Sequence, residues 1–454
     1  MRAALSKHAG ARVRSGEAGT SRRPALRSMA LLPLLSALIA PAAQAVDIGE
    51  AVAGGKTSLG FRYRLETVSQ DGIDEDAAAS TARARLTWNS AESDSLSFGI
   101  ETDYSLILGI EDFNSTTNGK TRYPVVADPD GFDLNQAFVK FKEEDFTVTL
   151  GRQRINHGSQ RFIGGVAYRQ NEQTYDGMRL QTNVGALDID YAFIHNINRI
   201  FGPGDGAQPG DWYGNSHAFR ATIAAWPGHT IAGYAYLWDL ENDNGPGNSN
   251  ATYGAEYQGV FNQLTVTAML SNQSDHGDNP LSYEATHYLL QGDLKLGGIS
   301  ITAAYEVFGS DTGSTDDPEK FAATRFGGLM VDLGSNRHLA SLRFPAATLH
   351  KFQGWTDKFL IAPATGLHDA WVSVSGKVGE ATVTGVYHDF RSDVTLLDAV
   401  SGRPLLDNYG SEIGLSVTYP LRDNLGLLFK IARYSADDYA TDTTKAWLMF
   451  DWRW

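Results

Sequence analysis

From Thr57 onward the chain alternates apolar and polar residues with a period of two, which is typical of β-strands whose two faces meet different surroundings. In the first such stretch one face carries Leu59, Phe61, Tyr63 and Leu65, and the other carries Arg62, Arg64 and Glu66. The stretch over 80–89 repeats the pattern, with Arg83 and Arg85 on its polar face. A soluble sandwich and a membrane barrel both produce this alternation, so it does not separate the two.

The pattern predicts 18 strands. They fall at about 57–68, 80–89, 95–107, 133–142, 145–153, 173–182, 186–195, 215–226, 229–239, 252–261, 264–272, 283–295, 298–308, 367–377, 380–391, 408–419, 424–434 and 444–454. The connections alternate between short turns, such as 226–229 and 296–299, and long loops, such as 154–172 and 309–366. Short turns at one end and long loops at the other are the pattern of an outer-membrane barrel. We therefore expect an antiparallel transmembrane β-barrel of 18 strands, with 16 strands as the alternative.

The first 45 residues differ from the rest. They carry seven basic residues and one acidic residue, followed by the apolar stretch 29–40 and by Ala43-Gln44-Ala45. A basic segment, a short apolar core and a small-x-small site predict a signal peptide over residues 1–45, with the barrel over 46–454. Without those residues the chain keeps 31 basic and 52 acidic residues, a net charge of −21.

The composition of the chain excludes several classes of protein. The chain has no cysteine, which excludes a disulfide scaffold and a thiolate metal site. Its acidic balance is opposite to that of a generic nucleic-acid binder. Mean hydropathy is −0.27, and no apolar run reaches the length of about 18 residues that a membrane helix needs. We expect no cofactor, no metal ion and no nucleic-acid partner.

Aromatic residues point to the membrane. Residues 445–454 place Leu448, Phe450, Trp452 and Trp454 on one face, which resembles the terminal strand signal that the barrel-assembly machinery reads. An ordinary edge strand is the alternative. Further aromatic residues near strand ends fit the interfacial girdles of a barrel: Trp88, Tyr104, Tyr191, Trp226, Trp238, Tyr387 and Tyr419. Membrane lipid is therefore the first expected partner.

Two segments of the expected outer loops are dense in charged and aromatic residues: Gly151–Asp176 and Phe344–Leu360. Both resemble signature stretches of the alginate export family of outer-membrane barrels, and the barrel pattern extends the similarity from about residue 47 to the end of the chain. The resemblance implies an 18-stranded barrel in the bacterial outer membrane. It also implies passage of an anionic sugar polymer or a related solute.

Arginines form the expected substrate path. On the polar faces or in the loop after the fifth strand lie Arg62, Arg64, Arg83, Arg85, Arg152, Arg154, Arg161 and Arg169. Guanidinium groups stay charged and make two-pronged hydrogen bonds to carboxylates, so a ring of them would select anions. The same arginines could instead brace the wall by pairing with acids on the same face: Glu66, Glu101, Asp103, Glu256, Glu306 and Glu412. A general diffusion porin and a structural or adhesive barrel remain alternative functions.

The longest loop, 309–366, is too long for a structureless connection, and its later part is rich in apolar residues. We therefore expect it to fold into or over the barrel mouth. The residues expected to form a gate are His350, Lys351, Phe352, Trp355 and Lys358, with a static plug as the alternative.

Nothing in the sequence predicts an enzyme, and we expect no catalytic residues. Gly-x-Ser-x-Gly and His-Glu-x-x-His motifs are absent. The neighbouring pairs His368-Asp369 and His388-Asp389 would point to opposite faces of a strand, so neither pair forms a dyad.

Overall fold

The structure is a computed structural model that describes residues 48–204, 206–243, 245–311, 325–326, 329–330, 339–397 and 404–454. The predicted signal peptide, residues 1–45, lies outside these residues. Helices are few and short: α2 covers Ile48–Ala53, and the 3-10 turns η2 and η3 cover Pro246–Asn248 and Leu349–Lys351. In the described part of the chain, no helix has the length and apolarity needed to cross a membrane.

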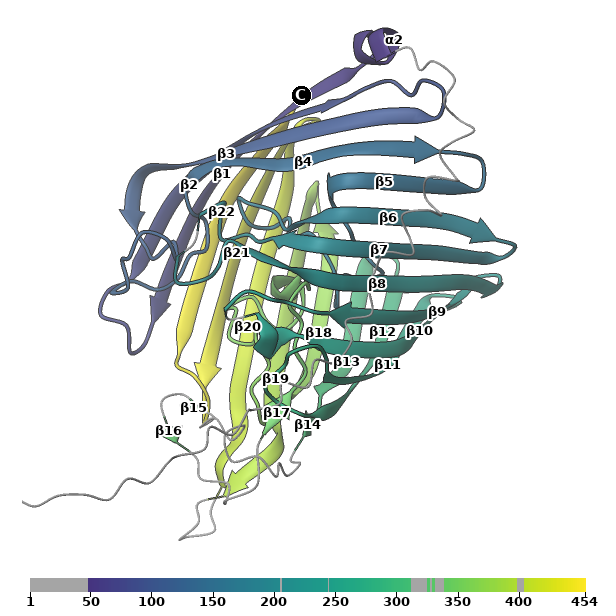
Figure 1. Cartoon of the computed structure of the whole chain (residues 1–454). Helices are drawn as coiled ribbons and strands as arrows, with labels where there is room; N and C mark the ends of the chain where they lie inside the picture. Colours follow the sequence, from purple (N-terminus) through teal and green to yellow (C-terminus); the bar gives the residue numbers. More distant parts are fainter. Residues whose placement is uncertain are drawn as a thin grey trace, which may run out of the picture. The chain divides into compact units, whose positions relative to one another are not determined.

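Eighteen strands build one sheet (Figure 1). They are β1 (Lys56–Gln70), β2 (Ala77–Asn89), β3 (Leu96–Asp112), β4 (Gly131–Lys142), β5 (Phe146–Gln153), β6 (Thr174–Val184), β7 (Leu187–Asn198), β8 (Asp211–Trp226), β9 (His229–Trp238), β10 (Asn250–Phe261), β11 (Leu264–Asp275), β12 (Glu284–Leu296), β13 (Ile299–Phe308), β18 (Leu367–Val378), β19 (Ala381–Leu397), β20 (Pro404–Arg422), β21 (Leu425–Ala436) and β22 (Thr443–Arg453). The two-residue strands are β14 (Ser310–Asp311), β15 (Arg325–Phe326), β16 (Leu329–Met330) and β17 (Ala340–Ser341).

The sheet closes on itself. Each long strand pairs antiparallel with the next along the chain, and β1 pairs with both β2 and β22. At the seam Arg62 lies opposite Asp451, and Gln70 lies opposite Thr443. The result is a closed barrel, which leaves the eighteen-stranded sheet without unpaired edges. The prediction of 18 strands rather than 16 is confirmed.

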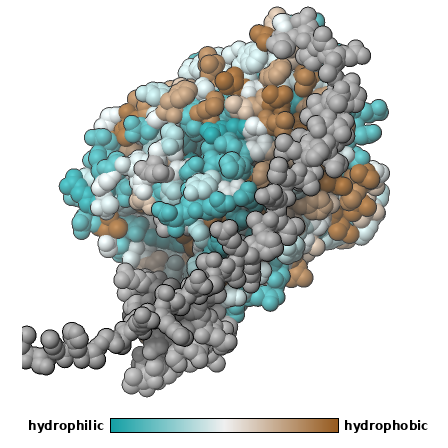
Figure 2. Space-filling view, viewed as in Figure 1, coloured by the Kyte–Doolittle hydropathy of each residue, from teal (hydrophilic) through white to brown (hydrophobic). Residues whose placement is uncertain are grey.

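The two faces of the strands separate as their alternation predicts. On β1, Arg62, Arg64 and Glu66 are buried, whereas Leu59 and Phe61 are exposed on the outside. Figure 2 shows apolar residues over the outer faces of the strands. In a membrane barrel, lipid covers such a face and the polar face lines the lumen.

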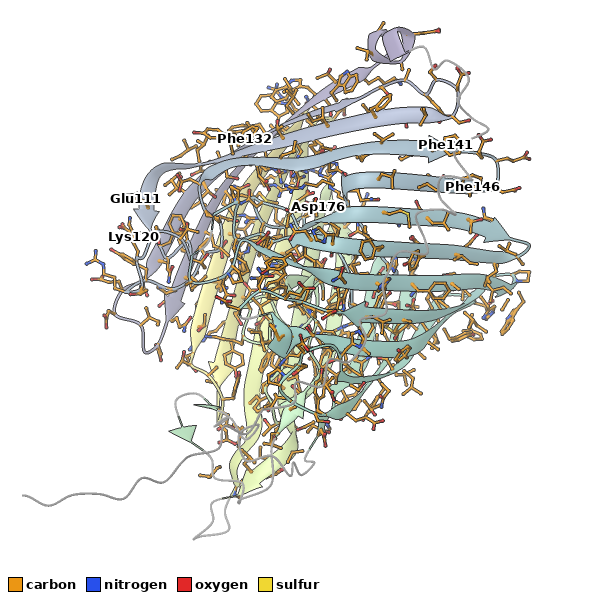
Figure 3. The ribbon with its side chains drawn as sticks, viewed as in Figure 1. Glu111, Lys120, Phe132, Phe141, Phe146 and Asp176 are labelled. Atoms are coloured by element: carbon orange, nitrogen blue, oxygen red, sulfur yellow. The ribbon has the colours of Figure 1, made fainter. Side chains whose placement is uncertain are left out.

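Turns and loops occupy opposite ends of the wall. Two residues join β6 to β7, β8 to β9, β10 to β11 and β12 to β13. In Figure 3, Phe141 and Phe146 lie at the short-turn end, and Glu111 and Lys120 lie at the end that carries the longer connections. Gly228 and Gly297 have φ of 79° and 60°, a left-handed conformation that suits a two-residue turn and that glycine adopts without strain.

Several strands run further than predicted, as β3, β19 and β20 show. β3 continues to Asp112, β19 reaches Leu397, and β20 begins at Pro404. In these strands the backbone hydrogen bonds continue beyond the residues whose side chains alternate between apolar and polar. The periodicity of the sequence therefore underestimates the length of these strands.

One expected girdle residue was assigned wrongly. Trp226 and Tyr419 are exposed on the outside, but Trp238 is only 2% exposed. It follows Tyr234 and Tyr236 at a spacing of two, and all three side chains face inward. Whether a tryptophan faces the lipid or the lumen depends on its position in the alternation of the strand, and not on how close it lies to the end of the strand.

Candidate functional site

Two inward-folded segments fill part of the lumen. The first inner segment, residues 154–173, leaves the short strand β5 and returns to β6. The second inner segment, residues 339–366, precedes β18. They join through a parallel bridge between Ile163 and Ala346, and the Gly164 N–H donates to the Ala346 carbonyl at 2.8 Å. We call the two segments together the plug.

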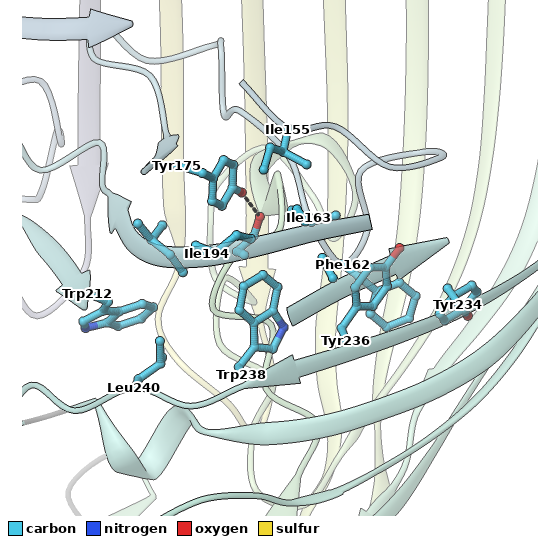
Figure 4. Close-up of a cluster of buried hydrophobic side chains, with 14 of the residues drawn as sticks. Ile155, Phe162, Ile163, Tyr175, Ile194, Trp212, Tyr234, Tyr236, Trp238 and Leu240 are labelled. Atoms are coloured by element: carbon cyan, nitrogen blue, oxygen red, sulfur yellow. Dashed lines mark hydrogen bonds between the residues drawn. The ribbon is translucent and has the colours of Figure 1, made fainter. Parts of the chain in front are cut away.

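An apolar cluster packs the plug against β6 to β9 (Figure 4). Phe162 contributes from the first inner segment: its ring stacks on that of Tyr236, with centroids 5.6 Å apart, and lies tilted against that of Tyr234, 5.1 Å away. The Tyr175 hydroxyl donates to the carbonyls of Gly164 and Ala346, at 2.8 and 3.1 Å. This one strand residue therefore holds both segments.

A second cluster buries the end of the long loop. Phe359 is 3% exposed, and its ring lies 4.4 Å from that of Phe390 and 5.7 Å from that of Tyr409. Leu342 is fully buried with them. For its described part, 339–366, the prediction that the long loop folds into the barrel is confirmed. Residues 312–338, apart from β15 and β16, lie outside the described part.

The arginines of β1 hold the first inner segment. Arg62 donates to Asp451 across the seam, at 2.6 and 3.0 Å, and to the Ala167 carbonyl at 3.0 Å. Arg64 is fully buried and pairs with Asp128 at 2.8 Å. Arg62 and Arg64, which were both predicted to line the substrate path, thus connect the barrel wall to loops inside the lumen.

Arg85 and Arg154 share the carboxylates of Glu101 and Glu172, with Arg85 Nε 3.5 Å from Glu101. Arg85 pairs with Asp103 at 2.5 Å and with Glu172 at 2.7 Å. Arg154 donates to Glu172 at 2.5 Å and also to Glu101. Burial raises the pKa of Glu172, but the charges of Arg85 and Arg154 outweigh it and lower that pKa to about 2. Glu172 therefore stays ionised at any physiological pH.

Arg152 and Arg169 also have acidic partners. Arg152 makes a two-pronged contact with Asp176, at 2.7 and 2.9 Å; Asp176 lies near the start of β6 (Figure 3). Arg169 donates to Glu66 on β1 at 3.0 Å and to Asp357 of the second inner segment at 3.1 Å. Arg169 thereby links both inner segments to the wall.

Arg161 completes a network that sequence reasoning missed. It pairs with Glu306 at 2.5 Å, and Glu306 accepts from His287 at 2.8 Å. Ser271 lies 3.2 Å from the other ring nitrogen of His287. Serine, histidine and glutamate thus stand in the order of a catalytic triad. The three residues are 16 and 19 positions apart in the sequence, and they meet because they lie at neighbouring positions on β11, β12 and β13. Only the register of these strands, and not a sequence motif, could have predicted this contact.

The arrangement braces the barrel and leaves no room for a substrate at Ser271. Phe162, Phe308 and Phe344 pack on the His287 ring, at centroid distances of 5.5, 5.2 and 6.4 Å. Ser271, His287 and Glu306 are each at most 3% exposed.

Histidine and aspartate also meet elsewhere. His388 bonds to Asp369 at 2.8 Å across β18 and β19, and His368 bonds to Asp393 at the same distance. Side chains next to each other in sequence do point apart, as expected, and the pairs form between strands instead. Within the described residues, no group of three or more histidine, aspartate or glutamate side chains could hold a metal ion.

Arg83 differs from the other seven arginines of the predicted path. It is 5% exposed, it lies directly opposite Arg62, and its Nη1 donates to the Gln170 carbonyl at 3.1 Å. Its Nε has no hydrogen-bond partner, and no carboxylate lies within 4.0 Å of its guanidinium in the part of the chain that the structure describes. Across the three neighbouring strands Arg62 lies between Arg83 and Asp451, so this carboxylate pairs with Arg62 and not with Arg83.

Glu412 holds the second inner segment by its backbone. The Thr356 N–H donates to this carboxylate at 3.0 Å, and the Trp355 N–H donates to it as well. Gly354 precedes them with φ of 78°, and a Cβ there would lie 2.6 Å from a Glu412 oxygen. Glycine adopts this conformation without strain, whereas a residue with a Cβ would be strained and would displace the Glu412 carboxylate.

The five predicted gate residues occupy different places. His350 is buried, Phe352 and Trp355 are half-buried, Lys351 is exposed and Lys358 is half-buried. Phe352 lies under Arg161, with its ring centroid 4.1 Å from the guanidinium carbon. Lys351 donates to the Ser159 carbonyl at 3.1 Å. All five belong to the plug.

A cavity of about 580 Å³ lies at the short-turn end of β5 to β8. Its lining includes Glu144, Asp145, Asp188 and Arg220 from the wall, and His157 from the first inner segment. The plug is thus accessible from that end of the barrel.

The alginate export family model matches residues 55–315, more than half of the chain. The chain belongs to the alginate export family. As a closed barrel of this family it lies in the outer membrane of a bacterium, in contact with membrane lipid. A search of curated proteins finds no match.

Solved structures with a similar fold come from Pseudomonas aeruginosa. They include OccK11 (OpdR), with a TM-score of 0.60, 11% identity and coverage of 89% of this chain and 97% of that one. OpdO matches with a TM-score of 0.61 and 12% identity, over 89% of this chain and 98% of that one. OccK9 (OpdG) matches with a TM-score of 0.61 and 13% identity, over 89% of this chain and 99% of that one. At such low sequence identity, the similarity shows that this alginate export family member shares the fold of these proteins, and nothing more.

Proposed function

We propose that this barrel is a channel for an anionic solute, of which an anionic polysaccharide or a uronate-type sugar fits best, and that Arg83 contacts the solute in the lumen. The observation that carries the proposal is that, among the described residues, no carboxylate lies within 4.0 Å of the Arg83 guanidinium. A buried guanidinium is costly without an anion, and a carboxylate is its best two-pronged partner. The other seven arginines each have an acidic partner.

Selectivity in planar bilayers tests the proposal. Reversal potentials across a KCl gradient should show that the channel prefers chloride, and Arg83→Gln should reduce that preference. Arg433→Gln serves as the control, because Arg433 lies on the outer face with its side chain 63% exposed. A cation preference that Arg83→Gln leaves unchanged would contradict the proposal and leave a general diffusion porin.

The plug favours a second candidate, a barrel with a structural or adhesive role. Bracing contacts join the plug to β1, β3, β13, β20 and β22. Such a barrel should show no conductance in the same bilayers, so the first recording separates the two candidates.

A further inference from the structure

Lys430, on β21, contacts three aromatic rings from three different elements. It is 6% exposed, and its Nζ lies 4.6 Å from the ring centroid of Tyr168, 4.4 Å from that of Trp355 and 4.9 Å from that of Trp447. Tyr168 belongs to the first inner segment, Trp355 to the second, and Trp447 to β22. A single ammonium therefore holds both parts of the plug against the wall through cation–π contacts.

A chain of hydrogen bonds continues from the ammonium into the second inner segment. Lys430 Nζ lies 2.8 Å from His350 Nε2, and His350 Nδ1 lies 2.6 Å from Asp357 Oδ1. Burial, together with repulsion from Lys430, lowers the pKa of His350 to about 3 against the opposing pull of Asp357. His350 is therefore neutral: it donates through Nδ1 to Asp357 and accepts through Nε2 from Lys430.

Lys430 has no close counter-ion. Within the described residues no carboxylate lies within 4.0 Å of its Nζ, whereas its neighbour Lys445 pairs with Asp357 at 2.8 Å. Rings and a neutral nitrogen replace the water that the ammonium loses on burial, but they compensate a charge less well than a carboxylate does. A carboxylate that reached Lys430 would thus compete with the plug for it.

We propose that Lys430 is the latch that holds the plug in the lumen, and that an anionic solute releases the plug by pairing with this ammonium. This inference rests on the proposed function for the anionic character of the solute. A ligand shifts a conformational equilibrium only by its difference in affinity for the two states. The solute gains the Lys430 contact only after the ammonium has left Trp355 and His350, so it favours the released state.

Single-channel recordings of Lys430→Met and Lys430→Arg test the latch. Methionine keeps the length of the side chain without its charge, and arginine keeps the charge. In KCl alone, Lys430→Met should raise the ratio of open to closed time about tenfold, which corresponds to about 1.4 kcal/mol, and Lys430→Arg should stay close to the original protein. If Lys430→Met has the same ratio of open to closed time as the original protein, the proposal is overturned. A band that shifts on boiling, as for the original protein, would show that the variant is folded.

Sodium galacturonate at constant ionic strength, with galactose as the neutral probe, tests the release. Galacturonate should raise the ratio of open to closed time in the original protein, in Lys430→Arg and in the outer-face control Arg433→Gln, but not in Lys430→Met. No effect on the original protein, or an equal effect on Lys430→Met, would overturn release by the solute. Reversal potentials from the same channels report anion preference separately, so a failure of the proposed function is seen independently of a failure of the latch.

Discussion

Among individual residues, Gly354 shows how closely the plug is fitted to the wall. Its left-handed backbone turns two successive N–H groups toward the carboxylate of Glu412. The carboxylate thus holds the main chain and also accepts from the Thr356 hydroxyl at 2.5 Å, while the Trp355 side chain stays free for other contacts. A substitution at this glycine acts on the plug without removing any charge.

We expect Gly354→Ala to loosen the plug. The left-handed conformation costs a residue with a Cβ about 1–2 kcal/mol, and the added carbon meets Glu412. Channel recordings should show longer open times. Gly385→Ala is the matched control, because a Cβ on that β19 glycine meets no atom within 4 Å. Equal open times in the two variants would show that the contact with Glu412 does not hold the plug.

Lys358 makes the charge of the plug sensitive to pH. Burial, followed by repulsion from Lys445, lowers the pKa of Lys358 to about 8 against the pull of Asp357. The ammonium is charged below that pH and neutral above it. Anion preference, measured from reversal potentials, should therefore fall between pH 7 and pH 9. Lys358→Met should weaken this dependence, and an unchanged profile in that variant would assign the titration to another group.

At the scale of elements, the strands were predictable from the sequence and the plug was predictable only in part. Alternation over β1 and β2 placed arginines and acids on one inner face, because a period of two fixes the face of every residue. The partner of Arg62 is Asp451, 389 positions away, and only closure of the sheet brings them together. The inner segments lack a period, so their path, and with it the lack of an acid within 4.0 Å of Arg83 among the described residues, could not be derived.

We expect the second inner segment to narrow the pore. A short Gly-Ser linker in place of residues 346–360 removes Trp355, His350 and the contacts of Asp357 while leaving all eighteen strands in place. Conductance should rise with the barrel still folded. The comparable exchange of residues 276–282, the connection after β11, provides the control. Unchanged conductance in the first variant would mean that this segment lies beside the conducting path.

For the molecule as a whole, stability depends on closure. The seam between β1 and β22 pairs eleven positions, from Gly60 with Arg453 to Gln70 with Thr443. An open sheet would expose unpaired backbone groups to lipid at two edges, which costs several kcal/mol for each unsatisfied group.

The complete chain should therefore migrate differently on gels before and after boiling, as a folded barrel resists detergent. A chain that lacks residues 443–454 should lose this shift, since β1 and β21 then have no partner at the seam. A heat-dependent shift in the shortened chain would show that the barrel closes without β22.

The position of the plug's anchors along the chain has a consequence for the order of folding. Glu412, Lys430, Lys445 and Trp447 lie on β20, β21 and β22, which leave the ribosome last. A growing or stalled chain has the second inner segment before it has these four anchors, although Tyr175 on β6 already reaches that segment at Ala346. Trp355 and Phe359 then remain accessible to chaperones and proteases until these strands pair, so fastening of the second inner segment is a late step of folding.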